Sequence, residues 1–261
     1  MRLILLSISL LFSSTVFSQS KQEKLDSFLK RLNVSWKKHN TDHFTFYVER
    51  DCFADNHIEQ IQYDFELTRN RIIYFLGDSN FIDTASIIIV DTKEKIKSIL
   101  GFEAQGFAIP ESDIAIFLNS KNYPIATKHE LTHYYAFKIW GRPYDNWLSE
   151  GLAVYYDNRW NGHPIDSLSK HLKDNKKLYS ISSLIKSFYS LNPMIAYPEI
   201  GSFTSFLLSE YGSLNFKELW LKGFNKIQLI YKKKLKELEN EWLKYLDRFK
   251  NENIDYSRHV R

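Results

Sequence analysis

The chain has 261 residues, a formal net charge of +4, 44% hydrophobic residues and one cysteine, Cys52. A single cysteine excludes an internal disulfide framework, and this length fits one domain or two closely packed lobes with a sizeable core. Lysines and arginines are spread along the sequence, so the charge gives no indication of a nucleic-acid partner.

Residues 1–20 have the features of a secretory signal peptide. Arg2 supplies the positive start, residues 3–11 form the apolar core, and residues 16–18 form a small-residue cleavage site. The apolar run is too short for a membrane-spanning helix, and no later segment has a long uncharged apolar run. We therefore predict a secreted or periplasmic protein with no integral membrane span after signal removal. The alternative is an uncleaved N-terminal anchor.

The next part of the chain predicts a small mixed β-sheet lobe over residues 41–123, preceded by an N-terminal helix or tether over residues 21–40. The hydrophobic pattern alternates between strand and helix and then leads into a hairpin. The predicted strands are 43–49, 85–90, 107–109 and 114–118, and the predicted helices are 55–76 and 92–100.

Residues 124–250 are expected to form a helical lobe, with residues 251–261 as a tail. Pro124 and Gly141 suit the start and end of one helix, and Asp145 can cap another that runs to about Trp160. The fold class is therefore α+β, with a sheet lobe, a helical lobe and a cleft between them.

The stretch 129–133 reads H-E-x-x-H, a motif of catalytic zinc sites. Residues four apart lie on one face of a helix, so His129 and His133 can direct ring nitrogens at the same ion. Glu130 lies beside them and can act as general base, and Glu150 is the expected third ligand. Two histidines and one glutamate leave a fourth tetrahedral position open, so we predict one catalytic Zn²⁺ per chain. The alternative is a surface helix with two ordinary histidines, or a relic site.

The spacing excludes two related zinc-site patterns. A metzincin would have glycine and histidine where this chain has Ala136 and Ile139, and the inverted order H-x-x-E-H is absent. The gluzincin pattern remains, in which a later helix supplies the glutamate ligand. Here 16 residues separate His133 from Glu150.

With these residues the chain resembles the peptidase MA-like domains, a gluzincin family of zinc metallopeptidases similar to thermolysin and aminopeptidases. The strings HELTHYY and NWLSEGLAVYYD carry the resemblance, which covers residues 41–249. Later strings similar to the family's helices are AYP, GSF, EYG and LENEWL. The resemblance implies a zincin-like fold with the active site in the cleft between the lobes.

The resemblance also implies a substrate-binding strand. In gluzincins the last strand before the metal helix is a sheet edge along the active site, with which an extended peptide can pair. This role falls on residues 114–118, and we expect four of them to bind substrate: Ile114, Ala115, Ile116 and Phe117. The alternative is an ordinary core strand.

Tyr197 matches the family's oxyanion-stabilising tyrosine in position, and Tyr211 is the runner-up. A packing role is the alternative for both. Asp157 lies seven residues after Glu150 on the same helix face and could hold the free ring nitrogen of a ligating histidine; the alternative is a solvent-facing aspartate. Gly151 suggests close packing of the two metal-bearing helices, because glycine costs about 1 kcal/mol relative to alanine inside a helix.

The leading hypothesis is an exported zinc metallopeptidase that hydrolyses a peptide or protein substrate, with Glu130 as general base. Endopeptidase and aminopeptidase activity both stay open, because Glu103 and Glu111 lie in no convincing amine-binding motif. The alternatives are a zinc-binding but non-hydrolytic peptide-binding protein, and an envelope assembly or interaction protein with a structural metal. Retention of Glu130 argues against the first, and the second predicts that chelation unfolds the protein.

Overall fold

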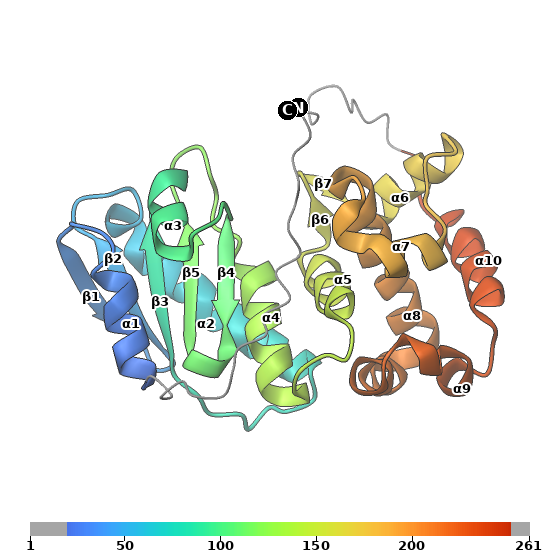
Figure 1. Ribbon diagram of the computed structural model, residues 1–261, viewed down its shortest axis with the longest axis horizontal. Helices are drawn as coiled ribbons and strands as arrows, with labels where there is room; N and C mark the ends of the chain where they lie inside the picture. The colour runs from blue at the N-terminus through green and yellow to red at the C-terminus, as the bar shows by residue number, and fades with distance from the viewer. Residues whose placement is uncertain (1–19, 252–261) are drawn as a thin grey trace.

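The computed structural model describes residues 20–251, so nearly all of the predicted signal peptide (1–20) and of the predicted tail (251–261) lies outside the described residues. A sheet lobe is followed by a helical lobe, as Figure 1 shows, and the α+β prediction is confirmed. No helix between residues 20 and 251 is long and apolar enough to cross a membrane.

The sheet lobe is built on five strands in the order β1-β2-β3-β5-β4. The strands are β1 (Trp36–Asn40), β2 (Phe44–Glu49), β3 (Ala85–Val90), β4 (Gly106–Ile109) and β5 (Ile114–Leu118). The three central strands run parallel, whereas β1 and β4 pair antiparallel at the two edges. The sheet is therefore mixed, as expected.

Helices cover both faces of this sheet. On one face α2 (Ile58–Phe75) and α4 (Thr127–Trp140) bury an aromatic cluster in which Phe65 makes edge contacts with Phe44 and Phe117. On the other face lie α1 (Lys21–Leu29) and α3 (Lys93–Leu100), in front of the sheet in Figure 1. Helix α4 is thus held by the core on one side and faces the second lobe on the other.

The N-terminal segment forms helix α1, the first of the two predicted possibilities, and packs on the sheet lobe. Leu25 and Phe28 of α1 are buried in the same cluster as Ile88 and Ile116 of the sheet. Residues 36–40, which we expected to stay outside the domain, form the edge strand β1. The observed sheet lobe therefore includes α1 and β1.

The β4–β5 hairpin forms as predicted, but the order of its strands corrects the substrate-binding prediction. β5 lies between β3 and β4, and residues Ile114, Ala115, Ile116 and Phe117 are each no more than 1% exposed. Both sides of β5 are already hydrogen-bonded, so these residues cannot pair with a peptide. The edge strand of this hairpin is β4, which pairs with no strand of the described residues on its outer side.

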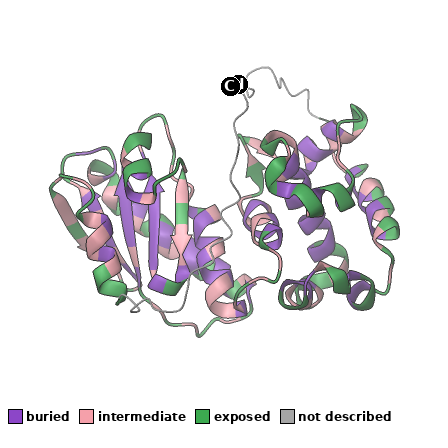
Figure 2. Ribbon diagram, viewed as in Figure 1, coloured by how far each residue is buried: buried purple, intermediate pink, exposed green. Residues whose placement is uncertain are grey.

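The helical lobe packs its helices around α8, whose buried residues run through the middle of the lobe in Figure 2. Its elements are α5 (Asn146–Asp157), β6 (Arg159–Trp160), β7 (His163–Pro164), α6 (Ile165–Asp174), α7 (Ile181–Ser187), η3 (Phe188–Ser190), α8 (Pro193–Lys222), α9 (Ile227–Tyr231) and α10 (Leu235–Leu246). Helix α5 ends at Asp157, and the C-cap residue Asn158 adopts a left-handed conformation with φ 56°. The β6–β7 hairpin that follows interrupts the all-helical segment that we expected.

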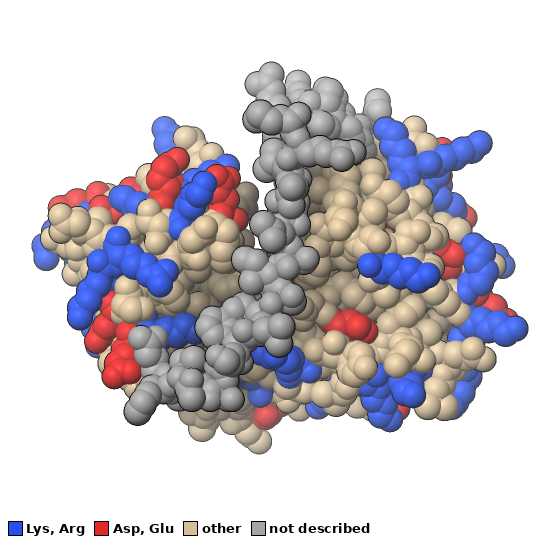
Figure 3. All heavy atoms as spheres, in the orientation of Figure 1, with Lys and Arg blue, Asp and Glu red and all other residues tan. Residues whose placement is uncertain are grey.

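Charged side chains lie on the outer surfaces of both lobes. Figure 3 shows lysines and arginines spread over both lobes on the face in view, interspersed with acidic residues. The interface between the lobes is formed by α4 and α5 and carries the predicted metal site.

Candidate metal centre

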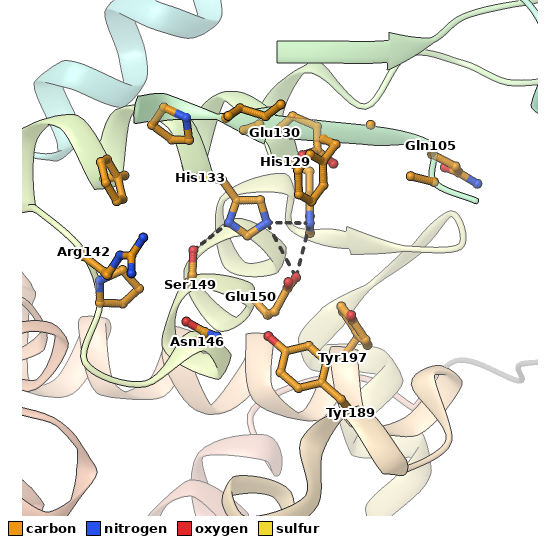
Figure 4. Close-up of a pocket in the computed structure, with 18 of the residues that line it drawn as sticks. Gln105, His129, Glu130, His133, Arg142, Asn146, Ser149, Glu150, Tyr189 and Tyr197 are labelled. Carbon is orange, nitrogen blue, oxygen red and sulfur yellow. Dashed lines mark hydrogen bonds and ion pairs between the residues drawn. The ribbon is translucent and has the colours of Figure 1, made fainter. Parts of the chain in front are cut away.

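The three predicted metal ligands converge between α4 and α5. His129 Nε2 and His133 Nε2 lie 3.2 Å apart, and Glu150 Oε2 lies 3.6 Å from each of them. Figure 4 shows the two rings and the carboxylate directed toward one another. One turn of α4 separates the histidines, and α5 brings the glutamate to them from the helical lobe.

These distances suit a tetrahedral zinc ion. Bonds of about 2.0–2.2 Å at tetrahedral angles place ligand atoms roughly 3.3 Å apart. The three observed separations bracket that value, and imidazole nitrogen with carboxylate oxygen is a donor set that zinc accepts. Three side chains would occupy three positions and leave a fourth open to the cleft. The group His129, His133 and Glu150 could therefore hold a metal ion.

Ser149 orients one of the histidines. Its Oγ lies 2.7 Å from His133 Nδ1, within hydrogen-bonding distance. A proton on Nδ1 that is donated to Ser149 leaves the lone pair of Nε2 for a metal, which is the usual arrangement around ligating histidines. Asp157 was the predicted partner for such a role, whereas Ser149, which directly precedes the third ligand, was not predicted.

Asp157 lies near His129 but does not hold it by a hydrogen bond. Burial raises the pKa of Asp157, and the nearby His129 and Lys128 act in the opposite direction. In the part of the chain that the structure describes, no hydrogen bond joins Asp157 to either histidine. Its contact with the site is therefore electrostatic.

Glu130 is buried beside the metal ligands, with 8% of its surface exposed. Burial raises its pKa, while the neighbouring histidines and a backbone hydrogen bond at Ala108 lower it. Gly106 makes room for this carboxylate, since a Cβ at Gly106 would lie 2.9 Å from Glu130 Oε1. The closeness of β4 to Glu130 therefore depends on a glycine at this position.

Two tyrosines line the cleft on the Glu150 side (Figure 4). Burial, together with the charges of Glu150 and Glu130, raises the pKa of Tyr197, so its hydroxyl keeps its proton near neutral pH. Its ring stacks on Trp160 at 4.5 Å. Tyr189 of η3 is a second phenol that senses the charge of Glu150, and no motif around it pointed to the site.

Tyr211, the runner-up for the donor role, lies elsewhere. Its hydroxyl contacts Glu241 and Lys233, and the three side chains line a separate surface pocket. Tyr211 is not among the residues that line the cleft at the metal ligands. Its hydroxyl therefore serves packing of α8 against the α9–α10 connection.

The packing of Gly151 also differs from the prediction. A Cβ on Gly151 would meet the Ile200 carbonyl oxygen at 3.3 Å and the Thr204 side chain, both from α8. The close approach is therefore between α5 and α8, not between the two helices that carry the metal ligands. Gly151 directly follows the predicted ligand Glu150, so its close contact with α8 helps to position the helix that carries this glutamate.

The metal ligands open into a cleft of about 720 Å³, a size typical of sites for small molecules or short peptides. The outer edge of β4 forms one wall, and Trp160, Tyr189 and Tyr197 form an aromatic wall opposite it. No family model matches the chain, and no curated protein matches it. The chemistry of this cleft is therefore inferred from its own residues.

Proposed function

We propose that the protein is a zinc-dependent hydrolase of peptide bonds, exported by its N-terminal signal. The observation that supports this most strongly is the convergence of His129, His133 and Glu150 beside the buried Glu130 and the outer edge of β4. A structural zinc site would have a fourth protein ligand and no adjacent base. Here the fourth direction opens into a substrate-sized cleft.

A zinc ion in this site would supply Lewis acidity, which polarises a carbonyl and lowers the pKa of bound water to about 7. Glu130 is the general base: its carboxylate accepts a proton from the attacking water and then donates it to the leaving amine. Burial raises the pKa of Glu130, which makes its carboxylate a stronger base than an exposed glutamate.

Tyr197 is the proposed donor to the oxygen that gains negative charge during the attack. Its raised pKa keeps the hydroxyl protonated, and its position near both Glu150 and Glu130 suits a donor beside the reacting carbonyl. Tyr189 also lies near Glu150 and is the second candidate for this donor role. Tyr197→Phe is expected to lower kcat at least tenfold while zinc binding is retained, and Tyr189→Phe is expected to have a smaller effect.

β4 is the proposed binding strand for the substrate main chain. No strand of the described residues pairs with its outer edge, where the Ala108 backbone hydrogen-bonds Glu130. An extended peptide can add to such an edge as a further strand. β4 thus replaces residues 114–117 as the strand that we expect to bind substrate. Main-chain pairing provides affinity with little dependence on substrate sequence.

The test is hydrolysis of a quenched-fluorescence peptide library by the mature protein before and after chelation. We expect hydrolysis that chelation abolishes and added Zn²⁺ restores, with an unchanged circular dichroism spectrum, because the core forms without the metal ligands. An envelope protein with a structural metal would instead lose its fold on chelation. A non-hydrolytic peptide-binding protein would bind zinc and cleave nothing.

A further inference from the structure

We propose that Glu111 and Arg142 form a charge gate at one end of the cleft, where Glu111 binds the free α-ammonium group of a peptide. This inference rests on the proposed hydrolysis and names its substrate class. The substrates would be short peptides with a free amino terminus, from which the protein releases one or two residues.

Glu111 and Arg142 are the only charged side chains that line the cleft, within residues 20–251, apart from Glu130 and the metal-ligand group. Glu111 lies in the turn η2 (Pro110–Ser112) directly after β4, and Arg142 lies in the connection between α4 and α5. Arg142 Nη2 donates to Glu111 Oε1 at 3.0 Å, so the pair joins the two rims of the cleft. A longer peptide would have to pass this bridge.

The Arg142–Glu111 ion pair is exposed enough for Glu111 to exchange Arg142 for a substrate ammonium group. The Arg142 and Glu111 side chains are 76% and 49% exposed, and an ion pair this accessible to water contributes little stability. A substrate ammonium can therefore replace Arg142 on the carboxylate without a large penalty. Bound inside the cleft, that ammonium would make charge-assisted hydrogen bonds, which are stronger than neutral ones.

The direction of β4 decides which end of a peptide reaches the gate. In Figure 4, Gln105 and Arg142 lie at opposite ends of the cleft, with His129 and His133 between them. Because Gln105 precedes β4 and Glu111 follows it, β4 runs toward the Arg142 end. A peptide paired antiparallel with β4, the slightly more stable arrangement, therefore has its amino terminus at Glu111.

The spacing limits how many residues precede the bond that is cut. Ala108 contacts Glu130 and so marks the level of the reaction along β4. Glu111 is three positions further on, roughly 10 Å in an extended chain and less across a 3₁₀ turn. That distance fits one or two substrate residues between the amino terminus and the scissile bond.

The test compares peptides of identical sequence with a free or an acetylated amino terminus, using zinc-loaded protein. We expect kcat/KM to be at least tenfold higher for the free peptides, and Glu111→Gln to remove this difference. Arg142→Gln should keep the preference for free amines. Glu103→Gln is the matched control, because Glu103 is exposed, pairs with Lys97 and does not line the cleft.

Binding gives a readout that does not depend on turnover. In a Glu130→Gln background, free peptides should bind more tightly than acetylated ones, and adding Glu111→Gln should abolish the difference. Equal cleavage and binding of both peptide forms would overturn the gate while leaving the hydrolase proposal intact. So would a preference for free carboxyl termini that Arg142→Gln removes. No hydrolysis of any peptide by zinc-loaded wild type would overturn both proposals.

Discussion

Ser149 Oγ lies 2.7 Å from His133 Nδ1, on the opposite side of the ring from the Nε2 atom that faces His129. This contact fixes the ring orientation and favours the tautomer that can ligate zinc. Ser149→Ala should weaken zinc affinity roughly tenfold, because such supporting contacts are typically worth about 10–100-fold. Competition with a chromophoric chelator measures this. Ser149→Thr keeps the hydroxyl and should keep the zinc affinity. Ser98→Ala on α3 is a control that should bind zinc like wild type. Equal zinc affinity of Ser149→Ala and wild type would refute the role of Ser149.

Gly106→Ala should impair hydrolysis without impairing zinc binding. The new Cβ would lie 2.9 Å from Glu130 Oε1, so the carboxylate or β4 must move. A misplacement of about 1 Å at a reacting group can cost on the order of 100-fold in rate. Steady-state kinetics should therefore show a reduced kcat, while metal analysis should still show one equivalent of zinc. Ala104→Gly, a neighbouring change at the same rim, should leave kcat near wild type.

Gly151→Ala tests the α5–α8 contact. Overpacking against Ile200 and Thr204 should cost about 1–3 kcal/mol, partly offset by about 1 kcal/mol from the better helix propensity of alanine. Urea unfolding of the metal-free protein should show a lower midpoint. Thr204→Ala removes the side-chain atoms that the new Cβ would meet. This substitution should therefore lower the free energy of unfolding less in the Gly151→Ala variant than in wild type. A more stable Gly151→Ala protein would show that the approach is not tight.

Glu199 should make the folded state lose stability as pH rises. Burial, reinforced by nearby Glu239, raises the pKa of Glu199 to about 9 despite a hydrogen bond from the Tyr179 backbone. The unfolded pKa is near 4.5, so between the two values the folded state binds more protons. The contribution of Glu199 to the free energy of unfolding should therefore be greatest below pH 4.5 and fall by up to roughly 1.4 kcal/mol per pH unit toward pH 9.

Urea unfolding between pH 5 and pH 9 measures this slope. Glu199→Gln removes the titrating proton while keeping the side-chain shape, so its slope should be flatter and its stability at the alkaline end higher than wild type. Glu59→Gln, on the exposed face of α2, should leave the wild-type slope unchanged. If Glu199→Gln and wild type share one slope, Glu199 titrates at its ordinary pKa in the folded protein.

The metal-ligand cluster could be predicted from the sequence because its information is local. The four-residue spacing of His129 and His133 determines a shared helix face. Gly141 ends the helix as predicted, whereas α4 begins at Thr127, three residues after Pro124. The position of Ser149 beside His133 depends on how α5 crosses α4, which is a tertiary relationship. Tyr189 lies in a short 3₁₀ turn, where no periodic pattern exists to mark it.

The substrate-binding edge strand was predicted at residues 114–118, although the sequence pattern there indicates a buried central strand. Residues 114–118 read IAIFL, a continuous apolar run typical of a strand covered on both sides, whereas β4 reads GFAI and is followed by Pro110, as suits an edge. The prediction followed chain order instead of this pattern. Strand β1 escaped notice because WKKHN has no apolar alternation, and charged residues on an edge strand protect it from further pairing.

The most direct test of the proposed chemistry is to measure zinc content and peptide hydrolysis together for wild type and Glu130→Gln. Glu130 is not a ligand in the observed cluster, so both proteins should bind one equivalent of zinc. Hydrolysis should be present in wild type and lower by several orders of magnitude in the variant, with the fold unchanged. Equal hydrolysis by both proteins, or a wild type that binds no zinc, would contradict a metal-assisted mechanism with Glu130 as its base.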